Sequence, residues 1–181
     1  MLFCPSMWCS EFSLAELSPL KLPCDASEDM AAFELTTSGR VLVLTDREPQ
    51  TIEILTEGRP NRSVTVRQTG RAERIRYHGG YFYLQYSLPL RFARCSELEF
   101  PCIPKPVLTV SEGEFKEAGA SDFAVYPKQI VVLDDANERV LGLGIRSTSV
   151  LADLKELRGS TIYTARSGLF ALRQTVTGVE V

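Results

Sequence analysis

The sequence lacks most of the side chains from which catalytic and metal sites are built. His78 is the only histidine among 181 residues, and no Gly-x-Ser-x-Gly elbow accompanies it, so a Ser-His-Asp triad has a single possible base. The cysteines are odd in number and scattered, without a Cys-x-x-Cys pair: Cys4, Cys9, Cys24, Cys95 and Cys102. We therefore predict a protein that is not an enzyme and that holds no metal and no cofactor.

Long apolar runs are also absent. No stretch of about 18 apolar residues occurs, which predicts that the chain has no transmembrane span. The first ten residues are apolar but carry no basic group and are broken by Pro5, so a signal peptide is not expected. The scattered cysteines favour free thiols in a reducing compartment, and we predict a cytoplasmic protein.

Acidic residues are scarce in one segment of the chain. Residues 59–94 carry eight arginines against Glu73 alone, whereas residues 1–58 have a net charge of −7 and residues 95–181 a net charge of −3. Arginines that alternate on the solvent face of a sheet would explain part of this pattern. Segregation this sharp favours a face that binds an anionic partner.

Strand patterns dominate the first half of a composition that is ordinary for a globular protein, with 44% hydrophobic and 24% charged residues. Residues 31–45 form two alternating runs joined by a turn at Ser38-Gly39, and further strands are expected at 51–56 and 63–68. Two more flank the glycines that follow His78. Alternation in the first of these puts Arg74 and Arg76 on one face of the sheet.

The second half mixes strands with short helices. Three prolines within 101–106 predict a stiff linker, followed by a strand at 107–110. A capping box begins a short helix that ends at Gly119, and strands are expected at 130–135 and 140–147. An apolar stripe then predicts a helix from about 148 to 158, and residues 160–174 form a closing hairpin.

The order of these elements resembles a PUA domain, a small RNA-binding module. The matching residues are Gly119-Ala120 and the stretch IVVLDDANERVLGLGIRSTS at 130–149, whose Leu-Gly-x-Gly strand contains Gly142 and Gly144. The resemblance implies structural roles for Gly119, Ala120, Gly142 and Gly144. The expected fold is mainly β with short helices (α+β): a β-rich domain at 1–100, a linker at 101–106 and a PUA-like pseudo-barrel at 107–178.

The segment RIRYHGGYFYLQYSLPLRFARC at 74–95, its continuation to residue 121 and the closing IYTARSGLFALR at 162–173 are similar to the malignant T-cell-amplified sequence family. That resemblance implies a cytoplasmic translation factor which acts on the small ribosomal subunit with density-regulated protein. Its expected work is reinitiation and ribosome recycling, including tRNA release or placement.

A surface of this kind positions phosphates and stacks bases, and does not make or break bonds. Arginine forks bind phosphate in a bidentate manner, and exposed aromatic rings stack on unpaired bases. The predicted contacts to ribosomal RNA or tRNA are Arg74, Arg76, Arg91, Arg94, Lys116, Lys128, Arg146 and Arg173.

Two other functions fit the same patterns. One is a PUA-domain factor of ribosome biogenesis, which would share the C-terminal half. The other is a protein–protein adaptor built on a β-rich scaffold, in which the arginines meet an acidic protein and no RNA is bound.

Overall fold

A computed structural model describes residues 29–68, 70–87, 89–110, 120–126, 129–144, 147–153, 160–165, 168–175 and 178–180. These residues form fifteen β-strands and one short 3-10 helix, η2 (Asp135–Asn137). None of the helical structure among them is long and apolar enough to cross a membrane.

The strands form four antiparallel sheets, each a meander in which neighbours along the chain are neighbours in the sheet. The first sheet contains β1 (Met30–Leu35), β2 (Val41–Thr45), β3 (Thr51–Leu55) and β4 (Arg62–Thr65). The second contains β5 (Arg74–His78), β6 (Tyr81–Ser87), β7 (Leu90–Ser96) and β8 (Lys105–Thr109). The third contains β9 (Ala120–Tyr126), β10 (Gln129–Asp134), β11 (Arg139–Gly144) and β12 (Thr148–Asp153). The fourth contains β13 (Ser160–Ala165), β14 (Gly168–Thr175) and β15 (Gly178–Glu180).

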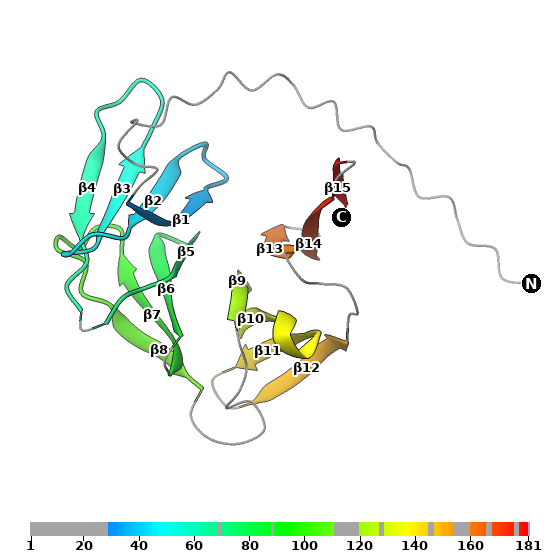
Figure 1. Ribbon diagram of the computed structural model, residues 1–181. Coiled ribbons are helices and arrows are strands. Elements are labelled where there is room, and N and C mark those ends of the chain that lie inside the picture. The colour runs from blue at the N-terminus through cyan, green and yellow to red at the C-terminus, as the bar shows by residue number, and fades with distance from the viewer. Residues whose placement is uncertain are drawn as a thin grey trace, which may run out of the picture.

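The four sheets stand side by side in an arc around a common axis (Figure 1). The first strand of each sheet lies nearest the centre: β1 contacts β5, β5 contacts β9, and β9 contacts β13. Successive four-stranded meanders with their first strands around one axis are the arrangement of propeller blades. The fold therefore resembles a β-propeller.

Apolar side chains fill the spaces between neighbouring sheets. Leu42, Leu44 and Ile52 of the first sheet pack against Phe82 and Leu84 of β6. The other face of the second sheet packs against the third sheet, where the rings of Phe92 and Phe123 lie 5.1 Å apart. A sheet between two others is buried on both faces, which explains why β6 is apolar almost throughout.

The expected α+β fold with a PUA-like pseudo-barrel is wrong, because the described residues form nearly all-β, propeller-like sheets. The helix predicted from about 148 begins instead as strand β12, which pairs with β11 through Leu141 and Val150. A free sheet edge offers backbone partners to a segment whose β-branched residues also suit a strand, and this pairing overrides a weak helical pattern. The helix predicted before Gly119 lies outside the described residues.

Several local predictions are confirmed. The hairpin at 31–45 is β1 and β2, and the one around His78 is β5 and β6, where Gly79 and Gly80 both have positive φ in a two-residue turn. The strands at 130–135 and 140–147 and the closing hairpin also form. The segment predicted as a linker at 101–106 leads into β8, which pairs with β7 and completes the second sheet.

The prediction that all the cysteines are free thiols is wrong for one pair. Cys95 at the end of β7 and Cys102 form a disulfide with a Cα–Cα distance of 5.5 Å. Seven positions separate them, which matches no short cysteine motif, but the loop that returns from β7 to β8 brings the two together.

Candidate functional site

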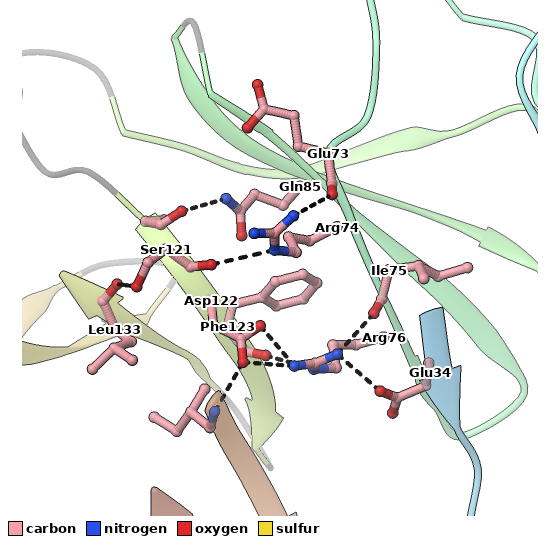
Figure 2. Close-up of polar contacts among 12 residues, drawn as sticks. Glu34, Glu73, Arg74, Ile75, Arg76, Gln85, Ser121, Asp122, Phe123 and Leu133 are labelled. Carbon is pink, nitrogen blue, oxygen red and sulfur yellow. Dashed lines mark hydrogen bonds and ion pairs between the residues drawn. The ribbon is translucent and has the colours of Figure 1, made fainter. Parts of the chain in front are cut away.

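Arg76 lies at the centre of a polar cluster on the axis of the arc (Figure 2). Its Nη2 donates to both carboxylate oxygens of Asp122 on β9, at 2.6 and 2.7 Å, and its Nη1 donates to Glu34 Oε2 on β1 at 2.9 Å. The backbone N–H of Ile162 on β13 donates to Asp122 Oδ2 at 2.8 Å. This axial cluster, defined as Glu34, Arg76 and Asp122, connects the first strands of all four sheets.

Burial decides the electrostatics of the axial cluster. Arg76 is only 8% exposed, and its Nε also donates to the carbonyl oxygen of Phe123 at 2.9 Å. Burial is the largest cause that raises the pKa of Glu34, and the Asp122 charge adds to it, while Arg76 acts in the opposite direction. The guanidinium of Arg76 is thus engaged within the fold, where it holds sheets together.

Arg74 lies beside this cluster at the start of β5. Its Nε donates to the carbonyl oxygen of Ser121 at 3.3 Å, and Gln85 Nε2 on β6 donates to the carbonyl oxygen of Ala120 at 2.8 Å (Figure 2). A pocket of about 430 Å³ opens here between the starts of β1, β5, β9 and β13, with Asp135 also on its wall. Its lining carries two arginines and two aspartates, so the charges balance and the pocket has no excess positive charge with which to select an anion.

The other two predicted arginines of the N-terminal half lie on opposite faces of the second sheet. Arg91 pairs with Tyr86 across the ladder and lies over its ring at 4.5 Å. Arg94 pairs with Tyr83, three positions further along β7, and lies 4.5 Å from the centre of the Tyr81 ring. The structure therefore brings Arg74 and Arg76 together and separates Arg91 from Arg94.

The predicted residues of the C-terminal half are described only in part. Lys116, Gly119, Lys128 and Arg146 lie outside the described residues, as does the side chain of Arg173, whose backbone is part of β14. Gly142 on β11 lies under Leu151, whose nearest atom would be 3.1 Å from an added Cβ. Gly144 donates its N–H to the carbonyl oxygen of Ser147 at 2.8 Å. Contact of the predicted set with RNA stays a prediction.

A surface that the sequence reading missed lies in the loop between β7 and β8, residues 97–104, here called the β7–β8 loop. Three large apolar side chains point into solvent there: Leu98 is 85% exposed, Phe100 53% and Ile103 54%. The sequence signal was present as bulky apolar residues among prolines. The proline spacing by itself predicts a linker and does not indicate that those side chains are exposed.

The β7–β8 loop is fixed at both ends. The disulfide joins Cys95 to Cys102, and the backbone of Cys102 donates to Thr65 O at 3.0 Å and accepts from Arg67 N at 2.9 Å. At the other end, Glu97 N donates to Gly80 O at 2.9 Å. The loop therefore presents its apolar side chains from a preorganised backbone.

Charged groups flank the same loop. Glu97 accepts hydrogen bonds from Arg40 and from the Tyr77 hydroxyl, and the Arg40 hydrogen bond is the largest cause that lowers the pKa of Glu97. The guanidinium of Arg62 lies 4.8 Å from the centre of the Phe100 ring. Lys105 Nζ pairs with Glu99 Oε1 at 3.2 Å. Among the described residues, no three His, Cys, Asp or Glu side chains are grouped to hold a metal.

Comparison with known proteins gives a fold and no function. No protein family and no curated protein matches the sequence. A Bacteroides thetaiotaomicron protein of unknown function superposes with a TM-score of 0.58 and 10% sequence identity, over 83% of this chain and 40% of that chain. The structure of YCF48 bound to D1 peptide superposes with a TM-score of 0.45 and 10% sequence identity, over 80% of this chain and 46% of that chain. This chain thus spans less than half the length of either structure.

Proposed function

We propose that this protein is a non-catalytic binding scaffold that presents the β7–β8 loop to a partner protein. The single observation that carries the proposal is the exposure of Leu98, Phe100 and Ile103 on a backbone fixed by a disulfide. Three large apolar side chains exposed on one short, fixed loop favour an interaction site.

The energetics favour such a loop as the centre of an interface. Fully burying a Leu or Phe side chain contributes about 1.5–3 kcal/mol, and a few such residues dominate most interfaces. A loop already held by a disulfide loses little conformational entropy when it binds, so more of that free energy appears as affinity.

The charges around the loop describe the partner. Arg62, which packs on Phe100, is exposed, as is Lys105 at the end of the loop. The ion pair with Glu99 leaves the Lys105 side chain highly exposed, so its ammonium group stays accessible to a partner. The partner that fits is a protein with an apolar groove bordered by carboxylates, and charge complementarity at that border sets orientation and association rate.

The test is site-specific photo-crosslinking in the cells that make the protein, with a photoreactive amino acid at position 98. We expect one crosslinked protein, and we expect the crosslink to disappear in the Phe100→Ser/Ile103→Ser double variant. The matched control places the same group at position 151, where Leu151 on β12 is another exposed apolar residue. Crosslinks that are identical from both positions, or absent from position 98, would contradict the proposal. A crosslink to a second copy of this chain would show that the loop forms a homodimer and does not bind a different protein.

RNA binding is the second candidate, and one observation favours it. Arg94 is exposed and lies against the rings of Tyr81 and Tyr83, and an exposed arginine–tyrosine stack is a surface on which unpaired bases also stack. The roles in reinitiation and recycling on the small ribosomal subunit follow from the resemblance to the malignant T-cell-amplified sequence family, and they stay predictions.

An electrophoretic mobility shift with single-stranded RNA tests this candidate. Binding that weakens steeply with salt, and weakens further in Arg94→Ala, would favour RNA over protein as the partner. An unchanged shift in Arg94→Ala, or no shift at all, would count against it.

The proposed cytoplasmic location is weakened by the disulfide, since such bonds persist mainly in oxidising compartments.

A further inference from the structure

A second pocket lies between the β2–β3 turn and the segment that joins β4 to β5. It has a volume of about 510 Å³, and three arginines contribute to its lining: Arg47, Arg67 and Arg71. None of the three belongs to the set predicted to bind RNA. The pocket contains none of the residues of the β7–β8 loop, so it is a separate feature of the molecule.

Hydrogen bonds hold the walls of this pocket in place. Gln50 Nε2 donates to Thr45 O at 3.0 Å and to Ala72 O at 2.8 Å, and Gln50 Oε1 accepts from Ala72 N at 2.9 Å. The Gln50 carbonyl also accepts from Val66 N at 2.8 Å. One side chain thus fixes both walls relative to each other, and the pocket exists before any ligand arrives.

The arginines differ in how far they are neutralised within the chain. Arg71 pairs with Asp46 at the pocket wall. Within the described part of the chain, the guanidinium groups of Arg47 and Arg67 have no hydrogen-bond or ion-pair partner, and both side chains are exposed. Glu48 also lines the pocket and offsets one positive charge.

A fourth guanidinium stands behind one wall. Gly70 lies against Arg91, and an added Cβ at Gly70 would be 2.9 Å from Arg91 Nη2. Gly70 also has a φ of +92°, so the chain approaches Arg91 here in a conformation that favours glycine. Three guanidinium groups line the cavity against two carboxylates, with Arg91 behind the Gly70 wall, and this excess of positive charge favours an anion inside it.

We propose that this pocket binds a compact polyanion through the guanidinium groups of Arg47 and Arg67. The chemical class is a small molecule or terminal group with two or more anionic oxygen groups, which guanidinium forks recognise in a bidentate manner. Such groups come from phosphate esters or from polycarboxylates. This site is independent of the protein-binding role proposed for the β7–β8 loop.

The experiment is isothermal titration calorimetry of the full chain with inorganic pyrophosphate in one arm and citrate in the other. We expect saturable one-to-one binding in at least one arm, weakened about tenfold in Arg67→Ala and again in the Arg47→Ala/Arg67→Ala variant. Binding of pyrophosphate alone identifies the phosphate class, and binding of citrate alone identifies the polycarboxylate class. The matched control is Arg59→Ala, an exposed arginine outside the pocket, which should bind as the parent does.

Two results would overturn the proposal. One is the absence of saturation in both arms up to about 10 mM ligand, a range that would reveal any site with a dissociation constant of about 1 mM or tighter. The other is equal weakening in Arg59→Ala, which would show a general charge effect instead of a site. Each variant should unfold at the same midpoint temperature as the parent, which establishes that the substitution acts on binding and not on folding.

Discussion

Two arginine–carboxylate clusters join the first sheet to the second, and they differ in burial. The axial cluster pairs Arg76 with Glu34 and Asp122 on the inner strands. The second, here called the rim cluster and defined as Arg40, Tyr77 and Glu97, lies at the end of the β1–β2 hairpin and is closer to solvent.

The difference between the clusters appears in their carboxylates. The pKa of Glu34 is raised because burial outweighs its attraction to Arg76, whereas the pKa of Glu97 is lowered because its hydrogen bond with Arg40 outweighs a smaller burial. Ionisation of Glu34 therefore lowers the free energy of unfolding in the axial cluster, whereas ionisation of Glu97 raises it in the rim cluster. Solvent access, and not the presence of a partner, decides the sign.

The largest effect is expected where the axial cluster is broken. Asp122→Ala leaves the buried Arg76 with Glu34 as its remaining carboxylate and removes the acceptor of the Ile162 N–H, so we expect a loss of about 3–5 kcal/mol in the free energy of unfolding. Urea denaturation measures it. Asp135→Ala, a change of the same residue type at the nearby pocket wall, should cost about 0.5 kcal/mol or less. Similar losses in the two variants would refute the structural role of the cluster.

The next effect concerns the rim. The Cys95→Ala/Cys102→Ala variant opens a loop of sequence separation seven and should lower the free energy of unfolding by about 2–3 kcal/mol. Amide hydrogen exchange should quicken most at positions 97 and 102, whose N–H groups hold the β7–β8 loop, and should rise on β5 and β9 by no more than the loss of global stability requires. A larger rise on the inner strands would show that the two regions are not independent.

The rim carboxylate gives a smaller, pH-dependent effect. The pKa of Glu97 lies below its ordinary value of 4.5, so its stabilisation is present above pH 4.5 and is lost as the pH falls through the lowered pKa. Glu97→Gln should therefore cost about 1 kcal/mol at pH 7 and almost nothing in strong acid. Thermal unfolding over a pH series measures this. Glu99→Gln, which removes an exposed pair with Lys105, should show little change at any pH.

The local structure of the first half followed from the sequence, because its signals are short-range. Alternation and the glycine turns at Gly39 and Gly79 placed β1, β2, β5 and β6 correctly. The arrangement of the sheets could not be predicted in this way. Contacts between β1, β5, β9 and β13 join residues some forty positions apart, and no local pattern encodes them.

The arginine-rich segment 59–94 owes part of its charge pattern to partners within the same chain. The arginines of 59–94 predicted an anionic partner, yet some of the anions are carboxylates of the same chain: Glu34 and Asp46 come from the acidic segment before them, and Asp122 from the segment after. Only folding shows which arginines are neutralised internally. Arg76 is neutralised by carboxylates within the chain. Arg47 and Arg67 instead line a pocket that composition alone does not indicate.

The smallest effect has the opposite sign. Burial keeps the pKa of Glu34 above its ordinary value of 4.5, so the fold carries no penalty from this group below pH 4.5 and acquires one as the pH rises through the raised pKa. Glu34→Gln keeps an oxygen that accepts from Arg76 but removes the buried charge. It should match the parent in acid and be more stable than the parent by about 0.5 kcal/mol at pH 8. The same unfolding series used for Glu97→Gln measures it, and well above pH 4.5 the two variant curves should lie on opposite sides of the parent curve. If Glu34→Gln were instead less stable than the parent at pH 8, attraction to Arg76 would outweigh burial, and the axial and rim clusters would stabilise the fold by the same mechanism.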